Sequence, residues 1–304
     1  MSAPSKHRLM DAPISASTRL AHADRSRAEL LALLEQALGR GLHGLCFSAY
    51  GEGQSPDLDS VIDEDQVRAR LAIVRPHARW VRTFSCSDGN QHAPRIAHEL
   101  GLRTLVGAWL GTDRDKNEGE LERVIELARA GHADLVAVGN EVLLREDLSE
   151  DELLDYLGRV KAALPGVPIG YVDAYYLFCQ HPRLVAACDV IFANCYPFWE
   201  YCALDDALAY MREMYRRVVA IAGGKKVILS ETGWPSAGSP VGAAVPSVDN
   251  ALVYLLNTLE WTEVEGIELF WFAAFDEDWK AEHEGDRGVS WGLWDSAGQR
   301  KYAR

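Results

Sequence analysis

The feature that most constrains the fold is a regular alternation of short apolar segments with longer amphipathic ones along residues 26–304. The apolar segments are rich in Val, Ile, Leu and aromatic residues and lack strict polar–apolar alternation, which is typical of parallel strands covered on both faces. Eight such segments are present: Leu42–Ser48, Trp80–Phe84, Arg103–Trp109, Leu135–Asn140, Ile169–Val172, Val190–Asn194, Val227–Glu231 and Leu269–Phe275. This pattern predicts an α/β fold, a single (β/α)8 TIM barrel.

The segments between the apolar runs carry helix signals. Ser149–Glu152 (SEDE) is a capping box, and apolar residues at helical spacing follow it before Pro165-Gly166. Helices are also predicted at Asn117–Ala130, Leu204–Ala222 and Val248–Trp261, and a further helix, Ala28–Leu38, is placed to close the bottom of the barrel. A doubly wound sheet is disfavoured because no glycine-rich phosphate turn follows the first strand.

Residues 1–25, rich in Ser, Ala, Pro and His, are predicted to form a flexible N-terminal tail, and residues 26–304 the barrel domain. The first residues lack the continuous apolar stretch of a signal peptide, and no run of about 18 apolar residues predicts a membrane span. The compartment stays open: cytoplasmic for the chain as it stands, periplasmic or secreted if a leader or membrane segment has been removed.

The charge balance restricts the class of partner. Lys and Arg number 31 against 45 Asp and Glu, which gives a formal net charge of −14. Such a surface disfavours nucleic acid and anionic membranes, whereas a neutral polysaccharide such as a glucan meets no net repulsion. We expect a monomer that binds neither nucleic acid nor membrane. The six cysteines form no CxxC pair and are predicted to be buried thiols, with a disulfide between two of the later ones left open.

Several kinds of catalytic centre find no support in the sequence. The histidines are scattered and no HxH pair occurs, so we predict no metal site and no cofactor. No GxSxG nucleophile elbow is present. The glycine pair Gly223-Gly224 precedes the seventh strand, the wrong end for a phosphate site.

Two glutamates interrupt apolar strands at their C-terminal ends, where the catalytic groups of barrels project. Leu135–Glu141 (LVAVGNE) and Val227–Glu231 (VILSE) belong to the fourth and seventh strands of the count. Either carboxylate alone is equally well explained as a helix cap or an arginine partner, but both together favour a catalytic pair.

Two carboxylates facing one cleft suit glycoside cleavage, since one must be protonated and the other ionised. A separation of about 5–5.5 Å predicts retention of configuration, and about 6.5–9.5 Å inversion. The nine tryptophans also favour a carbohydrate, because pyranose rings stack on aromatic planes; any one of them could instead fill the core. Trp199 and Trp234 are the preferred candidates.

Five segments together resemble glycoside hydrolase family 17, a family of β-1,3-glucanases and glucanosyltransferases. Ile228–Ser236 (ILSETGWPS) is similar to its nucleophile signature, and Val138–Val142 (VGNEV) to its acid/base motif. The other segments resemble its first strand, its sixth strand, and its eighth strand with the closing loop: Gly44–Gly51, Asn194–Phe198, and Phe272–Lys280 with Trp291–Trp294. The resemblance implies a (β/α)8 barrel that retains configuration by double displacement.

The resemblance also implies roles for individual residues. Glu141 is expected to be the general acid/base, Glu231 the nucleophile, and Asn140 a hydrogen-bond partner of the sugar 2-hydroxyl. Glu277 and Lys280 correspond to a charged pair that supports the cleft. The remaining residues expected to bind substrate are Tyr50, Arg82, Tyr196, Trp199, Trp234 and Phe275.

Two departures bear on the substrate. Only about 30 residues separate Tyr196 from Val227, so the insertion that lengthens the groove of plant members is absent and the chain is more similar to microbial members. The first strand continues into Tyr50–Ser55 (YGEGQS) in place of the family's usual glycine/asparagine continuation.

The expected activity is retaining hydrolysis or transglycosylation of laminarin-type β-1,3-glucan. Open alternatives are mainly glucanosyl transfer that elongates or branches β-1,3/β-1,6 chains, hydrolysis of another β-glucan or a mannan, and a non-catalytic glucan-binding barrel.

Overall fold

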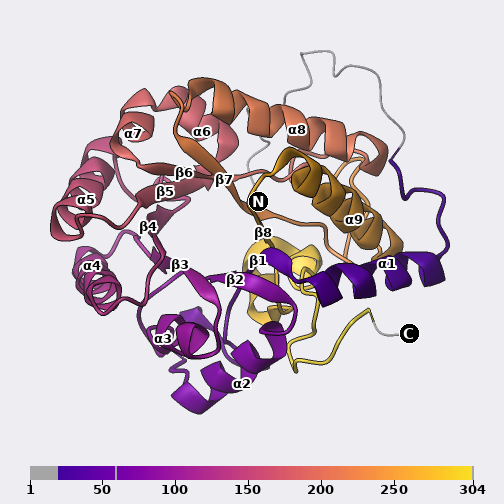
Figure 1. Ribbon diagram of the computed structural model, residues 1–304, viewed down its shortest axis with the longest axis horizontal. Helices are drawn as coiled ribbons and strands as arrows, with labels where there is room; N and C mark the ends of the chain where they lie inside the picture. Colours follow the sequence, from indigo (N-terminus) through magenta and orange to yellow (C-terminus); the bar gives the residue numbers. More distant parts are fainter. Residues whose placement is uncertain (1–19, 59, 303–304) are drawn as a thin grey trace.

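The computed structural model describes residues 20–58 and 60–302 and shows a closed barrel of parallel strands in the order β1 to β8, surrounded by helices (Figure 1). The predicted (β/α)8 barrel is therefore confirmed. The strands are β1 Leu42–Cys46, β2 Ala78–Arg82, β3 Arg103–Ala108, β4 Leu135–Asn140, β5 Ile169–Ala174, β6 Val190–Asn194, β7 Lys226–Thr232 and β8 Leu269–Trp271.

Helices connect the strands and include several that the sequence did not indicate. The α-helices are α1 Arg27–Arg40, α2 Glu64–Val74, α3 His92–Glu99, α4 Arg114–Arg129, α5 Glu150–Ala163, α6 Tyr175–Gln180, α7 Pro182–Ala187, α8 Leu204–Ile221, α9 Val248–Glu265 and α10 Ala281–Glu284. The capping box predicted before α5 is formed: Ser149 Oγ accepts from Glu152 N, and the Glu152 carboxylate accepts from Ser149 N. Short 3-10 turns lie at Pro56–Leu58, Asp278–Lys280 and Gly285–Arg287.

The eighth strand is shorter than predicted, because it ends at Trp271 rather than Phe275. Beyond Phe272, the backbone groups of Ala273 and Ala274 bond to residues 291–294: Leu293 N donates to Ala273 O at 3.1 Å and Trp294 N to Ala274 O at 2.9 Å. The closing loop thus takes hydrogen bonds that a continued strand would have needed.

The predicted position of the first helix was also wrong in one respect. Helix α1 packs side by side with α9 on the outside of the barrel rather than across its bottom (Figure 1). Residues 20–25 were predicted as part of the N-terminal tail. Leu20 is buried, and Ala21 N donates at 2.9 Å to Oδ1 of Asn257 in α9, so this segment is bonded to α9. Residues 1–19 lie outside the described part of the chain.

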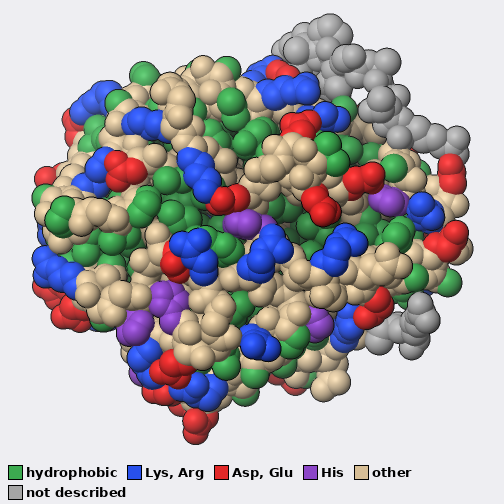
Figure 2. All heavy atoms as spheres, in the orientation of Figure 1, with side chains coloured by type: hydrophobic (Ala, Val, Ile, Leu, Met, Phe, Trp, Pro, Cys, Tyr) green, Lys and Arg blue, Asp and Glu red, His purple; other side chains and the backbone are tan. Residues whose placement is uncertain are grey.

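The described surface shows charged side chains of both signs interspersed with apolar ones on the face drawn in Figure 2. Within residues 20–58 and 60–302 no helix combines the length and the apolar character that crossing a bilayer requires. All six cysteines are free thiols. Cys46, Cys86, Cys188 and Cys195 are buried as predicted, whereas Cys202 is half-buried and Cys179 is exposed, so for these two the prediction of burial was wrong.

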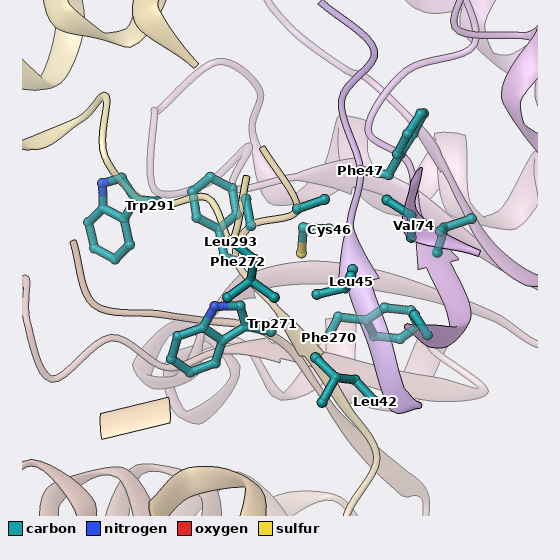
Figure 3. Packing of buried hydrophobic residues seen from close by; sticks show 14 of the residues in the cluster. Leu42, Leu45, Cys46, Phe47, Val74, Phe270, Trp271, Phe272, Trp291 and Leu293 are labelled. Atoms are coloured by element: carbon teal, nitrogen blue, oxygen red, sulfur yellow. The ribbon is translucent and has the colours of Figure 1, made fainter. Parts of the chain in front are cut away.

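The seam between β1 and β8 closes the barrel through tight packing. Gly44 lies opposite Phe270, and Leu45 opposite Trp271. Figure 3 shows Leu45, Phe270 and Trp271 at this seam. A Cβ on Gly44 would stand 2.5 Å from Phe270 Cδ1, and the Phe270 ring is fully buried, so it has no room to move. The absence of a side chain at Gly44 is therefore a condition for closure.

We predict that Gly44→Ala lowers the free energy of unfolding by about 1–3 kcal/mol, because overpacking a buried site forces strain. Gly39→Ala is the matched control: Gly39 is exposed in α1 and its Cβ would meet nothing within 4 Å. It should stabilise by up to about 1 kcal/mol through helix propensity. Denaturant titration measures both changes, and equal effects of the two substitutions would contradict this account of the seam.

Candidate active site

The two glutamates predicted at strand ends lie together at the mouth of the barrel. Asn194, the last residue of β6, donates through Nδ2 to Glu141 Oε1 at 2.8 Å and to Glu231 Oε1 at 3.0 Å. Because both oxygens accept from the same nitrogen, the distance between them cannot exceed the sum of these two hydrogen-bond lengths. The facing oxygens of Glu141 and Glu231 therefore lie close together across one amide, as two carboxylates that act on the same glycosidic bond require.

Asn194 is itself held in one orientation. Ser230 Oγ donates to Asn194 Oδ1 at 2.7 Å, so the amide nitrogen faces the two carboxylates. Asn194 was not among the predicted site residues, although it carries the signal that identified the glutamates: a polar residue that ends an apolar strand.

Glu231 is the more enclosed carboxylate, with 5% of its surface exposed. Arg82 Nη1 donates to its Oε1 at 2.6 Å and Tyr196 OH to its Oε2 at 2.8 Å. Arg82 is itself only 1% exposed, and its Nη2 donates to Asn140 Oδ1 at 2.6 Å. Both carboxylate oxygens are thereby fixed by donors, one of them a buried cation.

Glu141 has a different environment. It is half-buried, and its φ of +52° lies in the left-handed region that side chains other than glycine rarely adopt. Burial, and next the negative charge of Glu231, raise the pKa of Glu141 to about 7, against a smaller lowering by the Asn194 hydrogen bond. A carboxyl group with such a pKa can hold a proton near neutrality and donate it to a leaving oxygen.

The turn that carries Glu141 depends on a glycine. Gly139 has φ +86°, and a Cβ there would lie 2.8 Å from Val142 Cγ2. Glu141 N donates to Val172 O of β5 at 2.8 Å, which ties the turn to the next strand.

A buried carboxyl that the sequence argument missed lies on that next strand. Asp173 is fully buried, accepts from Tyr171 OH and from Ala174 N, and has its pKa raised to about 8 by burial and then by the charge of Glu141. Tyr171 OH also accepts from Leu143 N at 3.0 Å, so this pair supports the loop beyond Glu141.

Glu277 and Lys280 form a pair, with Lys280 Nζ 3.2 Å from Glu277 Oε2. The ammonium lies 4.1 Å from the centre of the Phe272 ring. Burial lowers the pKa of Lys280, but the neighbouring carboxylates of Glu277, Glu284 and Glu231 together raise it more, so the net shift is upward.

The predicted aromatic residues differ in how deeply they are buried. Tyr50 is buried and accepts from Asn90 Nδ2 at 3.2 Å, and Trp199 is half-buried against Trp291. Trp234 and Phe275 are only 1% and 2% exposed, so the structure packs them into the core and leaves them no free face for a sugar ring. The indole of Trp234 donates to Val245 O.

The alkaline limb of the pH–rate profile should report Glu141. The pKa of Glu141 is about 7, and a general acid acts in its protonated form, so with Glu141 as the acid kcat/KM for glycoside cleavage should fall as pH rises through about 7. Asn194→Ala removes a hydrogen bond that lowers this pKa, so the limb should move to higher pH in that variant. Rates on one oligosaccharide across pH provide the measurement, and a limb at lower pH in Asn194→Ala would refute this assignment.

The comparisons with known proteins agree with this geometry. Residues 44–292 match the family model described as the BtgE/BtgC glycoside hydrolase domain. The chain is 27% identical over 286 residues to the glucan 1,3-beta-glucosidase BGL2 of Candida albicans, covering 84% of this chain and 91% of that protein. It is 28% identical over 241 residues to a glucan 1,3-beta-glucosidase of Schizosaccharomyces pombe, covering 72% and 74%.

Among solved structures, the fold is similar to the glycoside hydrolase family 17 beta-1,3-glucanosyltransferase of Rhizomucor miehei, with a TM-score of 0.77, 29% identity, and coverage of 86% of this chain and 96% of that one. The resemblance inferred from the motifs is thus confirmed. The chain belongs to the BtgE/BtgC glycoside hydrolase family and is a glycoside hydrolase of the family 17 type.

Proposed function

We propose that this enzyme cleaves β-1,3-glucan chains with retention of configuration, through a covalent glucosyl ester on Glu231. The observation that carries the proposal is the single amide of Asn194 bound to both Glu141 and Glu231, which holds the carboxylates close enough for double displacement. The substrate class is supported by the names of the relatives and by a Rhizomucor miehei beta-1,3-glucanosyltransferase structure, 29% identical, that is in complex with laminaritriose.

In the first step, a Glu231 oxygen bonds to the anomeric carbon as the bond to the leaving oxygen breaks. Glu141 transfers its proton to that oxygen, so the departing chain leaves as a neutral alcohol. In the second step, water or a sugar hydroxyl attacks the anomeric carbon, Glu141 takes its proton, and Glu231 leaves as a carboxylate.

The electrostatics of the pair suit this change of role. The charge of Glu231 raises the pKa of Glu141 in the free enzyme. Esterification neutralises Glu231, so the pKa of Glu141 falls and its carboxylate becomes available as the base.

Arg82 and Asn140 have complementary tasks in this scheme. Arg82 occupies Asn140 Oδ1 as an acceptor, which leaves the amide nitrogen of Asn140 as a donor to the sugar 2-hydroxyl. The same guanidinium holds Glu231 in position for attack. Tyr196 OH donates to the other Glu231 oxygen, so that oxygen is held in place as well.

Glu231→Gln is expected to lower kcat on laminari-oligosaccharides by at least about 10⁴-fold while leaving sugar binding measurable, because the amide cannot form the ester. Glu122→Gln, the same change at an exposed position of α4, is the control and should keep full activity. In Glu231→Ala, added azide should restore turnover of an activated β-glucoside and give the α-glycosyl azide. Full activity of Glu231→Gln, or a β-azide from Glu231→Ala, would refute the assignment of the nucleophile.

Glucanosyl transfer is the second candidate, favoured by the similarity to a glucanosyltransferase. Products from laminaripentaose, separated by size and linkage, decide between the two. Longer or β-1,6-branched products identify a transferase, and only shorter products identify a hydrolase.

In either case the first-formed products should carry the β configuration by NMR, and α products would contradict retention.

A further inference from the structure

We propose that Trp109 is a sugar-binding platform at the mouth of the barrel, on which one glucosyl residue of the bound chain stacks. This inference rests on the proposed function and adds a binding residue to the same cleft.

Trp109 directly follows β3, and the packing of the residues on either side of it assigns its side chain to the cleft side. Val106, Ala108 and Leu110 pack in one cluster with Leu121 and Val124 of α4, so they face the helix layer. Side chains alternate across a strand, and Trp109 lies between two residues that face α4. Its indole therefore projects away from α4, and it follows the last residue of β3 at the rim that carries Glu141.

The backbone of Trp109 is held by a buried carboxylate. Trp109 N donates to Glu120 Oε2 at 3.0 Å, and Glu120 is only 3% exposed. The same carboxylate accepts from Ser85 Oγ at 2.7 Å and from Cys86 N at 2.8 Å. Glu120 thus joins the loops after β2 and β3 and acts as a positioning residue for Trp109.

The ring is supported on one face by a fixed cation. The Arg145 guanidinium carbon lies 4.3 Å from the centre of the Trp109 ring, and Arg145 Nη2 donates to Leu110 O at 2.8 Å. Arg145 Nη1 donates to Asn140 O, the carbonyl just before Glu141. Arg145 therefore contacts both the Trp109 ring and the backbone next to Glu141, and it fixes the position of the ring relative to that residue.

Despite this support, Trp109 is 40% exposed. The other large hydrophobic residues exposed within the described chain are aliphatic, namely Leu58, Val61, Leu144, Val219, Ile221, Val245 and Val264. A fixed indole that has a guanidinium on one face and 40% of its surface exposed can stack on the apolar C–H face of a pyranose, and its fixed position keeps the entropy cost of binding low.

The test uses the inactive Glu231→Gln background, so that binding is measured without turnover. Laminarihexaose is titrated by calorimetry into Glu231→Gln alone and combined with Trp109→Ala, Trp109→Phe or Val264→Ala. Val264 is the control. It is 80% exposed near the C-terminus of α9, at the end of the barrel opposite the rim that carries Glu141. We expect Trp109→Ala to raise Kd about three- to tenfold, Trp109→Phe to raise it less, and Val264→Ala to leave it unchanged.

A second measurement separates stacking from a structural effect. Trp109→Ala alone should keep the Tm within about 2 °C and the alkaline limb of kcat/KM at the wild-type pH, since Glu141 has not moved. A shifted limb or a lowered Tm that accounts for the weaker binding would overturn the proposal. Unchanged affinity of Trp109→Ala would also overturn it, and would leave the proposed function standing. Failure of Glu231→Gln to bind any laminari-oligosaccharide, with no wild-type cleavage, would instead overturn the proposed function.

Discussion

The buried ion pair between Arg82 and Glu231 is the interaction on which the arrangement of the mouth depends. Arg82 reaches from β2 to Glu231 on β7 and also to Asn140 on β4, while remaining 1% exposed. A carboxylate as enclosed as Glu231 is costly without a cation, and removing one partner of such a pair costs about 3–5 kcal/mol. The pair therefore brings both a charge balance and a fixed geometry, and it joins three strands that are remote from one another in the chain.

The surroundings of Glu141 differ from those of Glu231 in charge and in backbone conformation. No buried arginine bonds to it, its backbone adopts a left-handed conformation, and burial together with the Glu231 charge favours its protonated form. These features disfavour the folded state at neutral pH, where an exposed glutamate in the unfolded chain is ionised. Two glutamates at equivalent strand ends thus acquire different properties because one is paired with a cation and the other is not.

The barrel and the proximity of Glu141 and Glu231 could be predicted from the sequence because both depend on local patterns. Eight short apolar runs and a polar residue at the end of two of them can be recognised without knowledge of tertiary contacts. Asn194 followed the same pattern and was overlooked, since an amide at a strand end is a weaker signal than a carboxylate. Asp173 was hidden because its partner, Tyr171, lies within the same strand.

Features set by long-range packing were not predictable. Trp234 and Phe275 were predicted to bind sugar, but the exposure of a side chain depends on which residues pack against it. Phe198 and Tyr254 pack against Trp234. Arg70 and Trp294 pack against Phe275. The early end of β8 has a similar cause, since the loop at residues 291–294, distant in sequence, competes for its backbone hydrogen bonds. Trp109 is the converse case, an aromatic residue at a strand end that remains open.

The environment of Asn194 also bears on the chemical ageing of the protein. Deamidation would turn its donor amide into a third carboxylate facing Glu141 and Glu231, and would end the bridge between them. That reaction begins with attack by the following backbone nitrogen, and here the N–H of Cys195 is engaged with Glu231 O at 3.0 Å. Asn194 is 2% exposed and its side-chain oxygen is bonded to Ser230, so the contacts that orient it also protect it, and its lifetime is tied to the integrity of the barrel.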